Sequence, residues 1–453
     1  MKKALVIFLL ISFSLCQEPP PIKSGIAPYK NEYSDEFDVI NYDLEIGLSE
    51  KSDQIAGIAI ITLVLNKNIK QIPLDFTGLN IQSILINNSK ANYNYQEGKI
   101  FIESKKFKAN QTLIVSIVYN GKPDDGLIIG KNIHGNRSVF ADNWPNRARF
   151  WFPCKDHPSD KASVSYTIHA PSKWKVVANG ALIEKPKVSA ENAIGSKGSR
   201  HTWKWKSNVP IPTYNMVIGA AEMDITTLGV ATFAFSPSSL RSDGSIEISN
   251  YTFPEDTEKS QASFARSIEM VNFFSTKIGP FPYEKLANVQ SSTRFGGMEN
   301  ASAIFYSQEA IAKGRNIEST VSHEIAHQWF GDSVTEKEWN HLWLSEGFAT
   351  YFGALFFEQS DGRGNFIERM EKSKKRIFQS KVTDRPIVDY EVSDLFKLLN
   401  SNNYPKGAWV LHMLRGLLGD EVFFKGISKY YSEYNNKTAL TNDFMKIMEE
   451  VSG

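Results

Sequence analysis

The sequence predicts an α+β multidomain protein, in which an N-terminal antiparallel β-sandwich-like domain is followed by a mainly helical α/β domain. The chain has 453 residues, 42% of them hydrophobic and 12% aromatic, which is enough for two to three domains with large cores. Apolar residues alternate with polar ones in the first half, as in strands, and recur at spacings of three and four after about Phe253, as in helices.

The first residues, MKKALVIFLLISFSLC, predict an export signal over residues 1–16, followed by a linker over residues 17–36. Two lysines precede an apolar run of about twelve residues, Ala4 to Leu15, which is shorter than the roughly 20 needed to span a bilayer. Cleavage before Gln17 would give a secreted or periplasmic protein, whereas lipidation of Cys16 would anchor it to a membrane. We expect no transmembrane span in the mature chain.

The charge balance excludes some classes of partner. The chain carries 51 basic and 50 acidic residues, a formal net charge of +1, without a long run of one sign. We therefore expect no nucleic-acid partner. Beyond the predicted signal the only cysteine is Cys154, so we expect no internal disulfide, and the domains depend on their hydrophobic cores.

Residues 37–222 carry the strand pattern. Segments such as GIAIITLVL, LNIQSILIN, GKIFIES and QTLIVSIVY are separated by turns rich in Gly, Asn and Lys. This alternation predicts antiparallel strands that each bury one face, and hence the β-sandwich-like domain.

Residues 223–453 carry the helix pattern. Segments such as SQASFARSIEMVNFF, STVSHEIAHQWF, SEGFATYFGALFFEQ and KGAWVLHMLRGLL place apolar residues on one face of a helix. The segment LANVQSS, shortly before Arg294, is typical of a strand. A mixed α/β domain is therefore favoured over a pure helical bundle.

The stretch VSHEIAHQWFG is the first candidate for chemistry. Asn316 is a suitable N-cap, Ile317–Phe330 a predicted helix of nearly four turns, and Gly331 a stop signal. On this helix His323 and His327 lie one turn apart on the same face. Two imidazoles in this relation can both bind one zinc ion at about 2.0–2.1 Å.

A catalytic zinc site needs a third protein ligand and an open position. Glu346, in WLSEGFATYF, is the candidate, because the eighteen residues between it and His327 allow a turn and a second helix packed antiparallel to the first. The neighbours of Glu346 are mostly apolar or aromatic, which favours a ligand over a solvated helix charge. Glu324, beside the first histidine, can act on metal-activated water.

The stretch RFGGMEN is the second candidate. Gly296 and Gly297 leave the backbone unobstructed, so a substrate could lie against this edge as an added strand, with Glu299 near its end. An unpaired carboxylate there would bind a cation. Taken alone, the stretch favours a glycine turn followed by a surface glutamate.

Three blocks together resemble a known family. GGMEN, HEIAHQWFGDSVTEKEWNHLWLSEGFATYF and YPKGAWVLHML match, in order and spacing, the signatures of the gluzincin metallo-aminopeptidases, relatives of aminopeptidase N and leukotriene hydrolase. IPLDFTGLNIQSILINN and RARFWFPCKDHPSDKASVSY resemble the β-domain of that family. The resemblance runs from about Phe37 to the end. It implies a thermolysin-like zinc peptidase domain over residues 223–453, in a short form lacking the C-terminal helical domain.

The resemblance also implies a function and a site. It implies a zinc-dependent aminopeptidase that hydrolyses the first peptide bond of peptides with a free N-terminus, using one Zn²⁺ per chain and metal-activated water. The implied zinc ligands are His323, His327 and Glu346, the general base is Glu324, the transition-state stabiliser is Tyr404, and the substrate-binding edge is Gly296, Gly297, Met298 and Glu299, with Glu299 holding the free amine.

Some positions depart from the family pattern. The family usually has Gln or Glu as a second amine ligand where this chain has Trp144, and Asp142 is the candidate to replace it. An epoxide hydrolase is disfavoured, because Leu399 and Phe396 stand where those enzymes have a tyrosine and an aspartate. A catalytically inactive peptide-binding relative and a zinc endopeptidase are the remaining alternatives.

Overall fold

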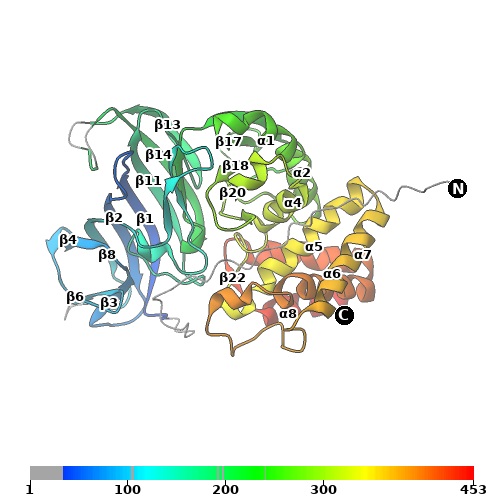
Figure 1. The fold of residues 1–453 in the computed structure, drawn as a ribbon. Coiled ribbons are helices and arrows are strands. Elements are labelled where there is room, and N and C mark those ends of the chain that lie inside the picture. The colour runs from blue at the N-terminus through cyan, green and yellow to red at the C-terminus, as the bar shows by residue number, and fades with distance from the viewer. Residues whose placement is uncertain (1–33, 104–106, 191–192, 196–197, 240) are drawn as a thin grey trace.

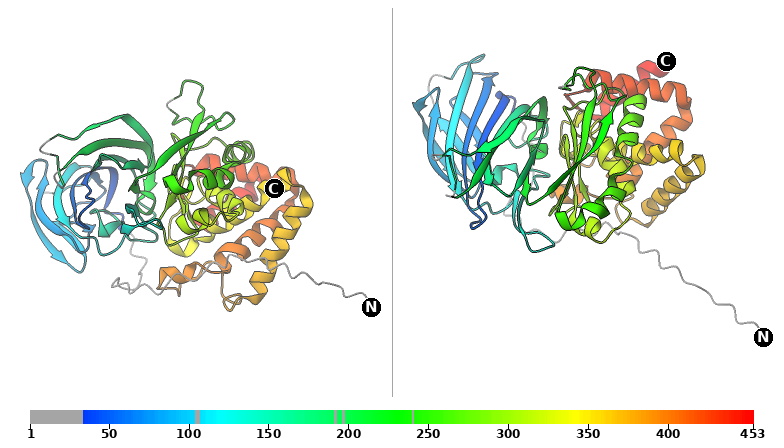
Figure 2. Two further views of the ribbon diagram at one scale, coloured as in Figure 1. Left: turned by 45° about the horizontal axis from the view of Figure 1, so that its top comes forward. Right: turned by 90° about the horizontal axis from the view of Figure 1, so that it is seen from above.

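The computed structural model describes residues 34–453, except 104–106, 191–192, 196–197 and 240. An all-strand part and a mostly helical part lie side by side (Figures 1 and 2). This confirms the predicted fold class. The predicted export signal and nearly all of the predicted linker lie outside the described residues.

The largest sheet of the N-terminal part has eight strands in the order β13-β14-β11-β1-β2-β8-β4-β5. Their bounds are β1 Phe37–Gly47, β2 Ile55–Leu65, β4 Asn80–Ile86, β5 Ser89–Lys90, β8 Thr112–Gly121, β11 Lys161–Pro171, β13 Ala181–Val188 and β14 Arg200–Pro212. Along β2 and β8 every second residue is buried, because alternate side chains face the core.

Two smaller sheets complete this part, in the orders β12-β15-β10-β9 and β3-β7-β6. Their bounds are β3 Gln71–Asp75, β6 Asn92–Gln96, β7 Lys99–Glu103, β9 Leu127–Lys131, β10 Arg137–Ala141, β12 Lys175–Ala178 and β15 Ile218–Ala221. One pairing differs from the antiparallel expectation, since β1 pairs with β11 in parallel. These two strands are far apart in sequence, so no hairpin turn fixes their relative direction.

The second part contains a five-stranded mixed sheet in the order β16-β17-β18-β20-β19. Its strands are β16 Asp224–Ala231, β17 Ile246–Thr252, β18 Leu286–Ser291, β19 Gly297–Met298 and β20 Ala303–Ser307. The predicted strand LANVQSS is β18. The short strand β19, from the GGMEN block, pairs only with β20 and so forms one edge of the sheet.

The remainder of the second part is mainly helical, and its helices pack beside this sheet (Figure 1). They are α1 Thr257–Phe264, α2 Ser267–Lys277, α3 Gln308–Ala312, α4 Glu318–His327, α5 Trp343–Ser360, α6 Arg363–Gln379, α7 Gly407–Tyr434 and α8 Thr441–Ser452. Short 3₁₀ turns are η1 Ala148–Phe150, η2 Thr213–Asn215, η3 Pro254–Asp256, η4 Trp339–His341 and η5 Leu395–Leu398, and η6 Asn402–Lys406 is a π-helical turn. Strands β21 Thr335–Glu336 and β22 Thr438–Ala439 pair with each other.

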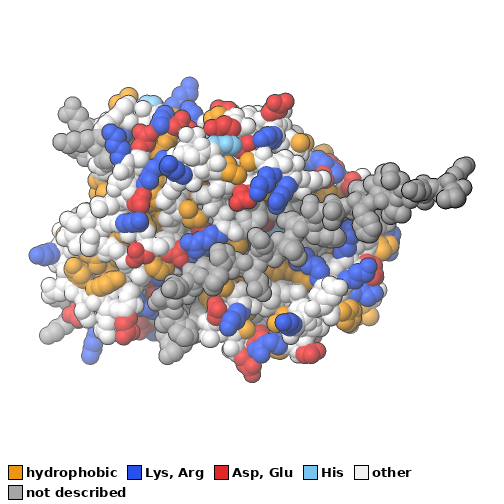
Figure 3. Space-filling model, viewed as in Figure 1, with side chains coloured by type: hydrophobic (Ala, Val, Ile, Leu, Met, Phe, Trp, Pro, Cys, Tyr) orange, Lys and Arg blue, Asp and Glu red, His pale blue; other side chains and the backbone are white. Residues whose placement is uncertain are grey.

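The surface carries charges of both signs. On the face seen in Figure 3, basic and acidic side chains lie interspersed among uncharged ones. Among the helices of the described residues, none is at once long enough and apolar enough to cross a bilayer.

Candidate metal centre

Helix α4 carries three of the predicted site residues, His323, Glu324 and His327. The helix begins at Glu318, one residue after the predicted start at Ile317, so Ile317 and not Asn316 takes the N-cap position. Oδ1 of Asn316 accepts a hydrogen bond of 3.0 Å from the backbone N–H of Glu318. The helix ends at His327, three residues before the predicted end at Phe330. The chain leaves the helix early because Phe330 forms a bridge with Val334 and Gly331 adopts a positive φ of 115°.

Helix α5 brings Glu346 to these histidines. Gly353 lies against His323, where an added Cβ would be 3.1 Å from the histidine Cα, while Ser345 lies against His327. The two helices therefore run antiparallel, as predicted from the spacing. The hydroxyl of Ser322 donates a 3.0 Å hydrogen bond to the carbonyl of Gly353 and fixes this contact.

The three predicted ligands converge on one point. Nε2 of His323 and Nε2 of His327 are 3.0 Å apart, and each lies 3.2 Å from Oε2 of Glu346. Ligand atoms bound at about 2.0–2.1 Å in a tetrahedral site lie about 3.3 Å from one another. The spacing and the donor set of two imidazoles and one carboxylate therefore fit a zinc ion.

The ring of His327 is oriented by its other nitrogen. Nδ1 lies 3.0 Å from the carbonyl oxygen of Phe330 and 3.1 Å from the hydroxyl of Ser345. A carbonyl can only accept, so Nδ1 carries the proton and Nε2 keeps its lone pair for a metal. Nothing in the sequence pattern marked Ser345 for this role, because it depends on the α4–α5 contact.

Tyr404 lies beside both Glu346 and His323. Its hydroxyl donates a 2.6 Å hydrogen bond to Oε1 of Glu346, and its ring stacks on that of His323 at 6.0 Å. The π-helical turn η6 reaches this place because α5 and α7 meet at two glycines. A Cβ on Gly347 would lie only 2.9 Å from Cα of Gly407.

The edge strand β19 lies directly against Glu324. A Cβ built on Gly297 would be 2.5 Å from the carboxyl carbon of Glu324, whereas one built on Gly296 would meet nothing within 4 Å. Gly297 is therefore required for the close approach of the edge strand to α4. Burial raises the pKa of Glu324 well above its usual value, and the carboxylates of Glu299 and Glu346 raise it further.

Glu299 follows β19 and faces the same point. Its ligand-type oxygen lies within 4.8 Å of those of Glu324 and His327. Its backbone carbonyl accepts a 2.7 Å hydrogen bond from the side-chain amide of Gln328, which fixes the end of the edge strand. The side chain is buried, and burial raises its pKa.

The site as a whole favours a cation. Burial alone would lower the pKa of His327, but the carboxylates of Glu346 and Glu299 outweigh this and raise it well above its usual value. Burial would raise the pKa of Glu346, but His327 and His323 together lower it to about 2. Positive charge is thus stabilised where the three ligand atoms meet.

Asp142 follows β10 and has a different set of partners. Its Oδ2 lies 3.0 Å from Nη2 of Arg147 and 3.4 Å from Nε of Arg294. Trp144 packs in the neighbouring space, with ring centroids 6.3 Å from Phe295 and 5.5 Å from Phe396. Trp144 therefore packs among aromatic rings.

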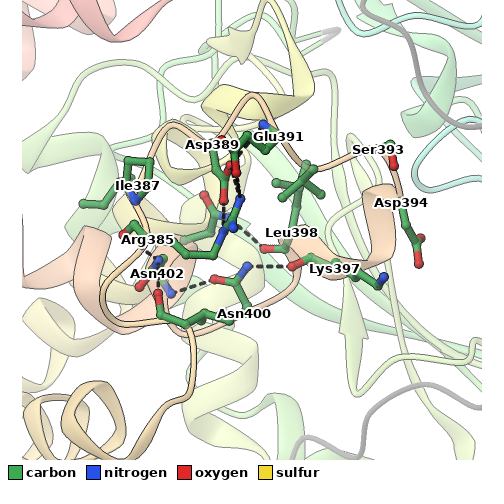
Figure 4. A pocket seen from close by; sticks show the side chains of 14 residues that line it. Arg385, Ile387, Asp389, Glu391, Ser393, Asp394, Lys397, Leu398, Asn400 and Asn402 are labelled. Atoms are coloured by element: carbon green, nitrogen blue, oxygen red, sulfur yellow. Dashed lines mark hydrogen bonds and ion pairs between the residues drawn. The ribbon is translucent and has the colours of Figure 1, made fainter.

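Two surface hollows lie beside these elements. One, of about 300 Å³, is formed by the segment between α6 and Tyr404 and contains the ion pair of Arg385 with Asp389 (Figure 4). None of the predicted site residues lines it. The other, of about 360 Å³, is lined by both parts of the chain, including Asp125 and Arg294.

The same two-part organisation is found in known proteins. Residues 39–215 match the peptidase M1 N-terminal domain, and residues 263–453 match the peptidase family M1 domain. The chain belongs to peptidase family M1. One curated M1 relative, probable aminopeptidase 2 of Sulfurisphaera tokodaii, is 27% identical over 84% of this chain and 48% of its own length. Aminopeptidase M1-C of Oryza sativa subsp. japonica is 31% identical over 68% of this chain and 34% of its own.

Solved structures show the same M1 fold. The M1 zinc metallopeptidase from Deinococcus radiodurans superposes with a TM-score of 0.78 at 22% identity, covering 92% of this chain and 91% of that one. Native yeast LTA4 hydrolase gives a TM-score of 0.77 at 23% identity, covering 92% of this chain and 65% of that one. The chain spans about half the length, or less, of the curated relatives named above.

Proposed function

We propose that this M1 chain is a zinc-dependent aminopeptidase, which removes the first residue of peptides with a free N-terminus. The observation that carries the proposal is the place of Glu299, whose carboxylate lies within 4.8 Å of the ligand-type atoms of Glu324 and His327. An acidic group at this distance from the metal ligands is within one residue's reach of the bond to be cleaved.

The zinc ion would be held by His323, His327 and Glu346. When bound, zinc supplies a Lewis acid that polarises a carbonyl and increases the acidity of water. The remaining steps fall to the side chains of this chain.

Glu324 takes a proton from the attacking water and later returns it to the leaving amine. Burial raises the pKa of this carboxyl above its usual value, which favours uptake of the proton from water. The hydroxyl of Tyr404 donates a hydrogen bond to the oxyanion that develops on the scissile carbonyl. To do so, the hydroxyl gives up its present hydrogen bond to Glu346.

Glu299 holds the ammonium group of the substrate. A charge-assisted hydrogen bond in a buried site is stronger than one in water, so the ammonium end is selected over a blocked one. With the ammonium fixed at Glu299, only the first peptide bond reaches the metal. This distance constraint makes the enzyme an exopeptidase.

The free edge of β19 receives the peptide backbone. Gly297 presents its backbone groups on the side that does not pair with β20, because directions alternate along the strand and the carbonyl of Gly296 accepts a hydrogen bond from Ser307 of β20. An extended peptide can add there as another strand, with hydrogen bonds to the backbone that do not depend on its sequence. The peptide is thereby aligned with its first bond beside Glu324.

A substrate panel tests this proposal. Aminoacyl fluorogenic substrates, their N-acetylated forms and internally quenched peptides should be assayed with and without a zinc chelator. We expect only the free aminoacyl substrates to be hydrolysed. This hydrolysis should be lost when zinc is chelated and should recover when zinc is added. Cleavage of quenched peptides at internal bonds would indicate an endopeptidase, and no cleavage in zinc-loaded protein would indicate an inactive binding protein.

The Glu299→Ala variant tests the amine anchor within the same panel. We expect it to reduce the preference for free over N-acetylated substrates. Glu284→Ala is a matched control, because Glu284 is a glutamate of the same domain and is as deeply buried, 6% exposed against 7% for Glu299. An unchanged ratio in the Glu299→Ala variant would show that the amine is held elsewhere.

We also propose that the chain is exported. The lysines and apolar run of residues 1–16 support this, with either free secretion or a lipid anchor at Cys16 as the outcome. Mass spectrometry of the mature N-terminus tests it. A chain that begins at Gln17 would show signal cleavage, a lipidated Cys16 would show anchoring, and an intact Met1 in the mature protein would contradict export.

A further inference from the structure

We infer that Arg294 is a positioning residue, which fixes the edge strand β19 and Glu299 relative to the rest of the site through two aspartates of the β-domain. The inference rests on the proposed aminopeptidase function and extends it to a residue outside the metal centre and the substrate-binding edge. Four charged side chains carry it, and they are called here the arginine-aspartate network: Asp125, Asp142, Arg147 and Arg294.

The two arginines share the two aspartates. Oδ1 of Asp125 lies 2.9 Å from Nη1 of Arg147 and 2.8 Å from Nη2 of Arg294. Oδ2 of Asp142 lies 3.0 Å from Nη2 of Arg147 and 3.4 Å from Nε of Arg294. Two carboxylates thus meet two guanidinium groups, and the network is neutral as a whole.

Most of the network is buried. The side chains of Asp142 and Arg147 are fully buried, and that of Asp125 is 11% exposed. Arg294, at 28% exposed, and Asp125 both line the hollow between the two parts of the chain. A backbone group also holds Asp125, since the Gly126 N–H donates to its Oδ1 at 2.8 Å. Buried ion pairs of this kind specify one arrangement more than they add stability.

Arg294 connects this network to the substrate-binding edge. It lies three residues before Gly297, in the bend that leads into β19. On the side of the segment that faces β20, the backbone N–H of Ser307 donates a 3.0 Å hydrogen bond to the carbonyl of Gly296. The far end of the segment is fixed by Gln328 at Glu299. Arg294 therefore anchors the near end of the segment to the β-domain.

The network also reaches the segment that carries Tyr404. The guanidinium of Arg147 lies 5.7 Å over the ring of Phe396, in the 3₁₀ turn η5 before Tyr404. Its Nε donates a 2.8 Å hydrogen bond to the carbonyl of Trp144, whose ring packs on the same Phe396. These contacts connect the edge strand, the β-domain and the segment before Tyr404 next to the proposed substrate-binding edge.

This geometry gives Asp142 a new role. The sequence suggested it as a second acceptor for the substrate amine. In the structure Oδ2 of its carboxylate faces two guanidinium groups, so a substrate ammonium that approached it would meet positive charge. We assign Asp142 to the positioning of Arg294, and amine recognition to Glu299.

The Arg294→Met variant tests this inference by steady-state kinetics. We expect a rise in KM of about tenfold or more for free aminoacyl substrates, because small displacements of a positioning group are costly in a site of this kind. We also expect a reduced preference for free over N-acetylated substrates and an unchanged zinc content. Arg294→Lys keeps the charge and should recover part of both effects.

Arg266→Met is the matched control. Arg266 lies in the same domain, is also 28% exposed, and forms ion pairs with three carboxylates away from the edge strand. We expect it to lower the melting temperature without a change in KM or in the amine preference. An Arg294→Met variant that behaves like this control would overturn the positioning role.

A double variant separates the two roles of Asp142. Asp142→Asn combined with Arg294→Met removes one charge of each sign, so the network stays neutral and the protein is expected to fold. If Asp142 acts through Arg294, the double variant loses no more amine preference than Arg294→Met alone. Additive losses would mean that Asp142 binds the amine directly and would overturn the assignment.

The same measurements keep this inference distinct from the proposed function. Wild-type protein that cleaves no aminoacyl substrate would overturn the aminopeptidase proposal and, with it, the basis of the inference. Normal wild-type hydrolysis with an unaltered KM and amine preference in Arg294→Met would overturn the positioning role alone.

Discussion

Tyr404 and Glu346 share one hydrogen bond of 2.6 Å, from the phenol to Oε1, while Oε2 of the same carboxylate lies 3.2 Å from the ring nitrogens of both His323 and His327. One carboxyl group therefore offers one oxygen to the histidines and the other to the tyrosine. The tyrosine can leave Glu346 for a substrate without breaking any contact among the three predicted metal ligands.

Tyr404→Phe should therefore reduce kcat without a loss of zinc. We expect a decrease of about 10²- to 10³-fold, the usual effect of removing one donor to a developing oxyanion. Zinc content by elemental analysis and kcat on an aminoacyl substrate check this together. A parallel loss of zinc would instead show that Tyr404 acts by holding Glu346 in place.

Glu324→Gln should keep zinc and lose turnover. The amide has nearly the same shape as the carboxyl but cannot take up a proton, and general-base catalysis typically contributes about 10²- to 10⁴-fold. We expect a decrease of this size in kcat, with a normal zinc content. Turnover close to that of the wild type would exclude Glu324 from the mechanism.

Gly297→Ala should impair activity far more than Gly296→Ala. The added methyl group at position 297 would lie 2.5 Å from the carboxyl carbon of Glu324, whereas at position 296 it would meet nothing within 4 Å. We expect a loss of at least about tenfold in kcat/KM for the first variant and little change for the second. Equal effects would mean that the glycines matter for backbone flexibility and not for this contact.

Much of the metal centre could be predicted from the sequence because its determinants are local. The positions of His323 and His327 follow from helix periodicity, and the spacing to Glu346 allowed one turn and a second helix. The end of α4 was predicted three residues too late, since the bridge between Phe330 and Val334 depends on tertiary structure.

The arginine-aspartate network could not be predicted in this way. Arg294 lies 169 residues after Asp125, and no local pattern links them. Asp142 was identified as an acid near the site, but its partners come from other segments, so its role was not visible. Long-range contacts of this kind are set by how the two domains pack, which periodicity does not report.

Lys285 allows a test of stability against pH. It is a partly buried lysine whose ammonium donates to the carbonyls of Ala178, in the β-domain, and Ser302, in the helical part. Burial lowers its pKa to about 7. Between about pH 7 and pH 10 the Lys285 amine is protonated in the unfolded chain but not in the folded chain. The free energy of unfolding therefore rises with pH, by up to about 1.4 kcal/mol per pH unit.

We therefore expect the melting temperature of the wild type, relative to that of Lys285→Met, to rise between pH 7 and pH 9. Thermal unfolding of both proteins across this range measures the difference. Lys313→Met, at a side chain that is 52% exposed, is the control and should leave the wild-type profile unchanged. Parallel profiles for the wild type and Lys285→Met would contradict the prediction.

The parallel pairing of β1 with β11 has a consequence for how the chain folds. β1 has β2 as its neighbour on one side, but its other neighbour is synthesised only after more than a hundred further residues, since Asn41 pairs with Ser163. Until then an apolar strand at the middle of the future sheet has an unpaired edge. Such long-range pairing slows folding and exposes an edge that can aggregate, so the β-domain should depend on chaperones during synthesis more than the locally connected helices do.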